Sequence, residues 1–108
     1  MVLHVIKWDV HPDKTEAFQK WSEGAIRRKL AVPGIVEFRA YRGVAGAPQV
    51  VVTHEFADMA AWAAWNFSDE VQKIQAELRT FTVNVTSELW GPLPSVPAPM
   101  RPGKQVRE

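Results

Sequence analysis

The chain has 108 residues, enough for one domain, and its 46% hydrophobic and 23% charged residues are typical of a globular protein. The net charge is +1, and the densest basic group, Arg27–Lys29, is expected to complement a helix dipole rather than to bind nucleic acid. No apolar run approaches the ~20 residues that span a membrane, and without cysteine there is no disulfide, thiolate metal site or cysteine nucleophile. Because the N-terminus also lacks signal-peptide features, we expect a cytoplasmic protein that binds neither nucleic acid nor membrane.

The first half of the chain predicts a strand, a helix and a second strand. Residues 2–9 alternate, as in a strand whose two sides differ. One side of this strand carries Val2, His4, Ile6 and Trp8. Residues 14–30 have one apolar stripe at three- and four-residue spacings, which predicts a helix. Pro33 and Gly34 end it, and residues 35–42 are rich in strand-forming side chains.

The second half predicts a strand, an interrupted helix and a last strand. Residues 49–56 follow a six-residue turn that contains two glycines, so we expect them to form a hairpin with the preceding strand. Asp58 is suited to cap a short helix, which Asn66 interrupts and Ser68 restarts. Residues 81–90 alternate and predict the closing strand. We expect one side of it to carry Phe81, Val83, Val85 and Leu89.

The order β-α-β-β-α-β predicts an α+β, ferredoxin-like unit over residues 1–90. Its four-stranded antiparallel sheet should be covered by helices on one face. Both sides of the strands are substantially apolar, so the second face needs cover that two helices cannot give. We therefore expect a homodimer in which two units close a dimeric α+β barrel. Residues 91–108 contain five prolines and are expected to be either a disordered tail or an arm across the partner.

Four short segments carry a resemblance to a known family. They are the opening strand that ends near Pro12, the Pro33–Gly34 stop, the Trp-x-x-Ser element at Trp65 and Ser68, and the closing Glu88–Trp90. With this order of elements, residues 2–90 resemble the dimeric α+β barrel superfamily, and most of all its antibiotic biosynthesis monooxygenase-like group. The resemblance implies a homodimer with a pocket in each subunit between helices and sheet. It also implies that some relatives oxidise aromatic polyketide-type molecules with oxygen and no cofactor, whereas others open the haem ring.

The haem-degrading relatives differ from this chain at two positions. They have an asparagine near the end of the first strand and an axial histidine after the Trp-x-x-Ser element. Here Lys7–Asp9 contain no asparagine, and Gln75 stands where the histidine is expected. The resemblance therefore implies that haem is not the cofactor, and we expect none. From the cofactor-independent relatives only Trp65 can be transferred.

His4 and His54 are the first candidates for chemistry. The first and third strands are expected to be central, adjacent and antiparallel, and matching their midpoints places the two histidines nearly opposite each other. Such a pair could act as a base, a metal site or a proton relay. Alternatively, each is a core histidine satisfied by a hydrogen bond. No carboxylate or third ligand can be identified nearby, so no metal site is predicted.

Five further side chains are candidates for substrate binding. Trp62 and Trp65 lie three residues apart in the predicted helix and either pack in the core or line a pocket. Asn84, on the polar side of the last strand, could orient a substrate oxygen. Arg39 and Tyr41 share one side of the second strand and could contact substrate or the partner subunit.

Two functions follow from these candidates. The first is a cofactor-independent oxygenase for an aromatic or polycyclic small molecule, with His54 or His4 as the base and tryptophans as pocket walls. The alternative is a dimeric module of the same fold that binds a small hydrophobic ligand, or only assembles, without catalysis.

Overall fold

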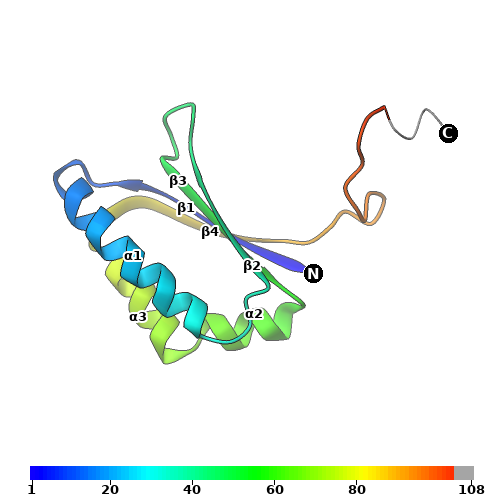
Figure 1. Ribbon diagram of the computed structural model, residues 1–108, viewed down its shortest axis with the longest axis horizontal. Coiled ribbons are helices and arrows are strands. Elements are labelled where there is room, and N and C mark those ends of the chain that lie inside the picture. Colours follow the sequence, from blue (N-terminus) through cyan, green and yellow to red (C-terminus); the bar gives the residue numbers. More distant parts are fainter. Residues whose placement is uncertain (104–108) are drawn as a thin grey trace.

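The computed structural model describes residues 1–103 as one sheet covered on one face by helices (Figure 1). In chain order its elements are β1 (Val2–Val10), a 3-10 turn (Pro12–Lys14), α1 (Thr15–Ala31), β2 (Glu37–Arg42), β3 (Val50–Phe56), α2 (Met59–Asn66), α3 (Asp69–Leu78) and β4 (Thr82–Trp90). The strands pair antiparallel in the order β2-β3-β1-β4, so β1 and β3 are central. The predicted ferredoxin-like α+β architecture is confirmed.

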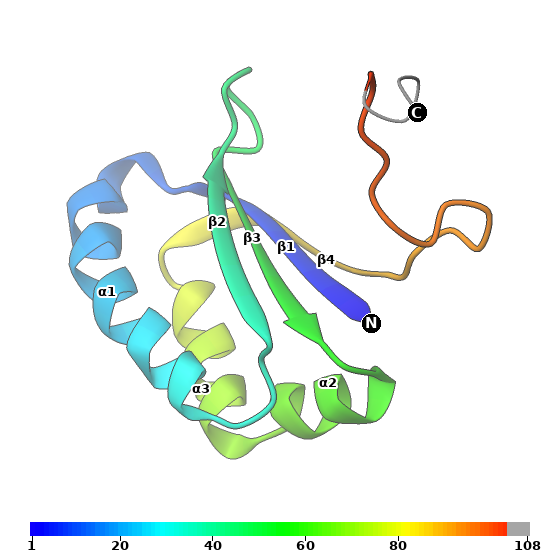
Figure 2. The same cartoon turned by 45° about the vertical axis from the view of Figure 1, so that its right-hand side comes forward.

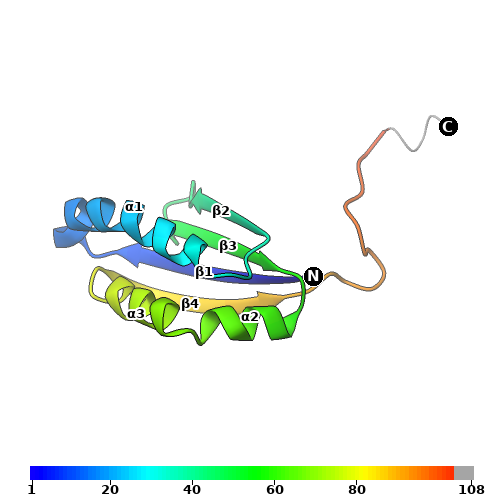
Figure 3. The same ribbon diagram turned by 60° about the horizontal axis from the view of Figure 1, so that its bottom comes forward.

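The helices lie along a single face of the sheet, with α1 and α3 next to each other (Figures 2 and 3). Four side chains, two from each helix, join α1 and α3. The Arg28 guanidinium donates to Glu70 at 2.6 Å and to Glu77 at 2.7 Å, and Trp21 Nε1 donates to the same Glu77 carboxylate at 2.7 Å. This network ties the outer edges of α1 and α3 together and leaves the space between the helices and the sheet to apolar side chains.

The break between α2 and α3 follows the predicted interruption. Ser68 is the N-cap of α3, and its Oγ accepts from the Val71 amide at 3.3 Å. The same hydroxyl donates to the Trp65 carbonyl oxygen at 2.8 Å, which ties the end of α2 to the start of α3. The Trp-x-x-Ser spacing therefore has a local structural cause, because it orients the helical turn that carries the Trp65 indole.

The predicted alternation of the last strand is wrong at its start. A register shift between β1 and β4 lies between Lys7 and Asp9, and Asn84 has a left-handed φ of 57°. This irregularity places one extra residue in β4, so that the strand reverses which face its side chains occupy. Thr82 is consequently buried under the helices, whereas Val83 is 42% exposed on the other side of the sheet.

Within residues 1–103, no helix covers the second sheet face (Figure 3). Tyr41 and Trp90 are about half exposed there, at 50% and 49%, beside ion pairs such as Lys7–Glu88. Beyond β4, residues 91–103 run away from the sheet without packing on it (Figure 1). The last five positions of the predicted tail, residues 104–108, lie outside the described residues. No helix within residues 1–103 is long and apolar enough to cross a membrane.

Candidate functional site

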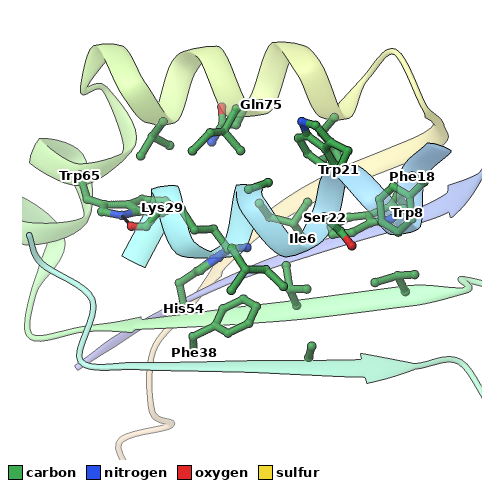
Figure 4. Close-up of a pocket in the computed structure, with 18 residues that line it drawn as sticks. Ile6, Trp8, Phe18, Trp21, Ser22, Lys29, Phe38, His54, Trp65 and Gln75 are labelled. Carbon is green, nitrogen blue, oxygen red and sulfur yellow. Dashed lines mark hydrogen bonds between the residues drawn. The ribbon is translucent and has the colours of Figure 1, made fainter. Parts of the chain in front are cut away.

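A cavity of about 220 Å³, here called the central cavity, lies between the sheet, α1 and α3 (Figure 4). Strands β1, β2 and β3 form its floor, and the helices form its roof and sides. Its walls are almost entirely apolar and aromatic. The lining residues are Ile6, Trp8, Phe18, Trp21, Ser22, Ala25, Ile26, Lys29, Phe38, Ala40, Val50, Val52, His54, Trp65, Val71, Ile74, Gln75 and Leu78. An apolar cavity of about 150 Å³ is known to hold benzene, so this volume suits one or two fused rings.

His4 and His54 lie directly opposite each other on the two central strands, as predicted. Their ring centroids are 5.4 Å apart, and both side chains are buried, at 1% and 0% exposure. Neighbouring antiparallel positions on one sheet face bring side chains this close. The pair therefore sits on the helix-covered face and not on the open one.

His54 is the histidine that borders the central cavity. Its ring lies between the indole of Trp65, at 4.9 Å between centroids, and the ring of Phe38, at 5.4 Å. Both of its buried ring nitrogens lack a hydrogen-bond partner within residues 1–103, which is unusual for buried polar atoms. Burial first, then the neighbouring Lys29 and His4 side chains, lowers its pKa to about 2. The imidazole is therefore neutral at pH 7, with a nitrogen lone pair free to accept a proton.

His4 lies next to His54 but does not line the central cavity, and its hydrogen bond comes from β4. Its Nε2 is 2.9 Å from the hydroxyl oxygen of Ser87 on β4, and its Nδ1 has no partner among the described residues. Burial first, and Lys29 second, lowers its pKa to about 4. Ser87 also lines a smaller cavity of about 130 Å³, here called the side cavity, together with Trp62 and Arg79.

The two candidate tryptophans have different surroundings. Trp65 is almost fully buried, lines the central cavity and donates from Nε1 to the Lys29 carbonyl oxygen at 3.1 Å. Trp62 lines the side cavity instead, and its ring lies 5.9 Å from that of His4. The structure therefore brings Trp65 to the central cavity with His54 and places Trp62 in the side cavity with Ser87.

Lys29 is a cavity residue that the sequence interpretation missed. Its ammonium lies 4.2 Å from the centroid of the Phe38 ring, and burial lowers its pKa to about 8. The group was interpreted as part of a basic helix end, and this holds for Arg28, which pairs with Glu70 and Glu77 outside the cavity. Lys29 faces inward because it follows Ala25 by four residues on the apolar stripe.

The other three predicted substrate contacts do not reach the central cavity. On β2, Phe38 and Ala40 line it, so Arg39 and Tyr41 face the open side of the sheet. Arg39 pairs there with Glu37 at 3.1 Å. Asn84 sits in the β4 irregularity and donates from Nδ2 to Asp9 at 3.0 Å. The cause for β2 is the two-residue period of a strand, which sends alternate side chains to opposite faces.

The residues present do not fit a haem group. Gln75 stands at the position expected for an axial histidine, and its Nε2 donates to the buried Asn66 Oδ1 at 2.9 Å. A carboxamide held in this way does not replace an axial imidazole. Among residues 1–103, no cluster of histidine and acidic side chains forms a metal site.

Comparison with known proteins places these features in a family. The model of the antibiotic biosynthesis monooxygenase family matches residues 1–77. Among solved structures, the Rv0793 protein of Mycobacterium tuberculosis superposes with a TM-score of 0.72 at 17% identity, covering 85% of this chain and 94% of that one. A variant of SnoaB, a cofactor-independent oxygenase from Streptomyces nogalater, gives 0.72 at 18% identity, with 90% and 97% covered.

A third similar structure is a dabb family protein with a ferredoxin-like fold from Mesorhizobium loti. Its TM-score is 0.73 at 17% identity, over 85% of this chain and 96% of that one. No curated protein sequence matches the chain closely enough to count as a relative. At these identities the solved structures support the fold, and the matching family model supports membership.

Proposed function

The chain belongs to the antibiotic biosynthesis monooxygenase family, and from that premise we propose that it oxidises a flat aromatic molecule with molecular oxygen in the central cavity. The observation that carries the proposal is the neutral imidazole of His54 on the wall of an apolar cavity, with no hydrogen-bond partner among residues 1–103. SnoaB, a structure of similar fold, is a cofactor-independent oxygenase, which supports a reaction without metal or flavin.

His54 would act as the base. A carbon acid flanked by aromatic rings gives a stabilised carbanion, which can pass electrons to oxygen directly. His54 has a low pKa and is therefore a weak base in isolation. Proton transfer from the substrate creates an ion pair between imidazolium and carbanion, and the attraction between the two charges at low dielectric favours the transfer. For a ring methylene group the balance is CH₂ plus O₂ giving C=O plus water, with one oxygen atom retained in the product.

Oxygen uptake with an anthrone-type substrate tests this function. We expect His54→Ala to lower the enzymatic rate by about 10²–10⁴, the usual contribution of a positioned base. His11→Ala is the matched control because His11 is half-exposed in the turn after β1 and does not line the central cavity. Incorporation of one ¹⁸O atom from labelled O₂ into the new carbonyl identifies a monooxygenase. Turnover that survives both His54→Ala and His4→Ala would exclude the histidine mechanism.

A binding module without catalysis is the second candidate. The strongly lowered pKa of His54 favours this candidate. Burial in any apolar binding site makes an imidazole hard to protonate, whether or not the site is catalytic. In that case aromatic ligands bind in the central cavity, but no oxygen is consumed with any anthrone- or quinol-type compound. The same uptake assay, combined with a binding titration, separates the two functions.

We also propose that the functional form is a homodimer assembled through the open sheet face. Half-exposed Tyr41 and Trp90, together with the Arg39–Glu37 pair, lie on that face and would contact the partner. The tail from residue 91 leaves the sheet beside Trp90, where an arm could reach the partner's surface (Figure 3). The alternative, a disordered tail, predicts that removing residues 91–108 leaves the dimer dissociation constant unchanged.

A further inference from the structure

We propose that Lys29 restricts the central cavity to aromatic molecules that carry an ionised oxygen on the ring system, such as phenolates or enolates. The inference deepens the proposed function, because it names the class of substrate that the same site would accept. It rests on the position of one ammonium group relative to the walls of the cavity.

Among the 18 described residues that line the cavity, Lys29 alone carries a full charge. The polar side chains that share the lining are Ser22, His54 and Gln75, and all three are neutral at pH 7. Gln75 is already bound to Asn66. Among the 18 lining residues there is no aspartate or glutamate, so the cavity itself offers no counter-ion to the ammonium.

The acidic side chains nearby are engaged elsewhere. Glu70 and Glu77 of α3 both accept from Arg28, which is the neighbour of Lys29 but points to the outer edge of the helices. Within residues 1–103, Lys29 forms no ion pair, and its ammonium contacts the face of the Phe38 ring at 4.2 Å. A buried cation without a counter-ion is costly, so a ligand that brings a negative charge next to it binds more favourably than a neutral ligand.

The protonation state supports this arrangement. With a pKa of about 8, Lys29 is mostly an ammonium at pH 7, despite its burial. The titratable groups that face it are His54 on β3 and, behind it, His4 on β1, and both stay neutral there. A ligand oxygen anion would therefore meet a single positive charge with no competing carboxylate. An aromatic anion is also the form of a substrate that gives an electron to oxygen most readily.

Calorimetric titration with 2-naphthoate and 2-naphthamide tests the inference, because the two ligands share one shape and differ in charge. At pH 7 we expect the wild type to bind the anion at least about tenfold more tightly, the equivalent of one pKa unit. Lys29→Met should abolish this preference while keeping naphthamide affinity within about threefold. Lys20→Met, which removes an exposed lysine of α1, should leave the preference unchanged.

A second measurement reads ionisation directly. Bound 4-nitrophenol turns yellow when it ionises, and we expect the wild type to lower its apparent pKa by about one unit relative to Lys29→Met. Lys29→Gln, which keeps a polar side chain without charge, should behave as Lys29→Met does and guards against a packing effect. Equal affinity of the wild type for both naphthyl ligands, a preference that survives in Lys29→Met, or no binding of either ligand would overturn the inference.

The outcome is separable from that of the proposed function. An anion preference without oxygen uptake supports the role of Lys29 and excludes the oxygenase. Oxygen uptake that continues undiminished on neutral, non-ionisable aromatics excludes the role of Lys29 and leaves the oxygenase standing.

Discussion

The ring of His54 lies against the indole of Trp65, with 4.9 Å between their centroids, and this contact organises one end of the central cavity. The indole Nε1 also donates to the Lys29 carbonyl oxygen at 3.1 Å. A single side chain of α2 therefore touches the candidate base on β3 and the backbone of the residue that carries the cavity's charge. Burial lowers the pKa values of both His54 and Lys29, and these shifts give two predictions on how the free energy of unfolding depends on pH.

On the acid side, the free energy of unfolding should fall as pH drops below about 6.5. The pKa values of His4 and His54 are about 4 and about 2 in the folded chain, against 6.5 in the unfolded chain. The unfolded state therefore binds protons first, and stability is lost from pH 6.5 downwards, at up to about 1.4 kcal/mol per pH unit for each histidine.

Urea unfolding at pH 7, 6 and 5, at one fixed protein concentration, measures this slope. His54→Phe keeps an aromatic ring among aromatic neighbours and should reduce the slope by about 1.4 kcal/mol per pH unit. His11→Ala is the control, because the His11 side chain is about half exposed, at 46%, outside the core. Identical slopes in His54→Phe and the wild type would show that His54 is protonated as easily in the folded chain as in the unfolded one.

On the alkaline side, the lysine in the cavity should produce a rise in stability. The pKa of Lys29 is about 8 in the folded chain and 10.5 in the unfolded chain, so between these values the unfolded state holds more protons. Unfolding then becomes less favourable as pH increases from 8 to 10.5. Lys29→Met should remove this rise and be more stable than the wild type at pH 7, whereas Lys20→Met should keep it.

The hydrogen bond between His4 and Ser87 gives a third prediction. Ser87→Ala leaves His4 Nε2 buried without its partner, which should cost about 1–3 kcal/mol of unfolding free energy. In a His4→Phe background the same substitution should cost much less, because no imidazole remains to be satisfied. A double-mutant cycle by chemical denaturation measures the coupling. A coupling near zero would indicate that the hydroxyl is solvated or bonded elsewhere in solution.

Much of the fold could be predicted because local signals and burial agree. The pairing of His4 with His54 followed from matching the midpoints of two central antiparallel strands. The register is well defined because a one-residue slip would turn an apolar side out of the core. The break before α3 was visible in Ser68, which caps one helix and closes the previous one. Ser68 lies within three positions of the residues that it bonds, Trp65 and Val71, so this part of the geometry is local in sequence.

The site was only partly predictable because its geometry depends on contacts distant in sequence. The irregularity at Asn84 is matched by Asp9 on another strand, and nothing in the alternation of residues 81–90 announces it. Trp62 and Trp65 lie three residues apart and both contact the His4 ring, but Trp65 lines the central cavity and Trp62 the side cavity. Lys29 was visible in principle, since Trp21, Ala25 and Lys29 follow one another at four-residue spacing.

The open sheet face gives the last prediction, on assembly. Trp90 is 49% exposed at the end of β4, and the Lys7 ammonium lies 5.7 Å from the centroid of its ring. If this face is the interface of a homodimer, Trp90→Glu places a charge among groups that assembly would desolvate, which typically costs several kcal/mol of association free energy. We expect light scattering at micromolar concentration to find a dimer for the wild type and a monomer for Trp90→Glu. Val44→Glu is the matched control, since Val44 is 88% exposed in the β2–β3 hairpin and away from the sheet face. A monomeric wild type, or a Trp90→Glu variant that remains a dimer, would contradict assembly through this face.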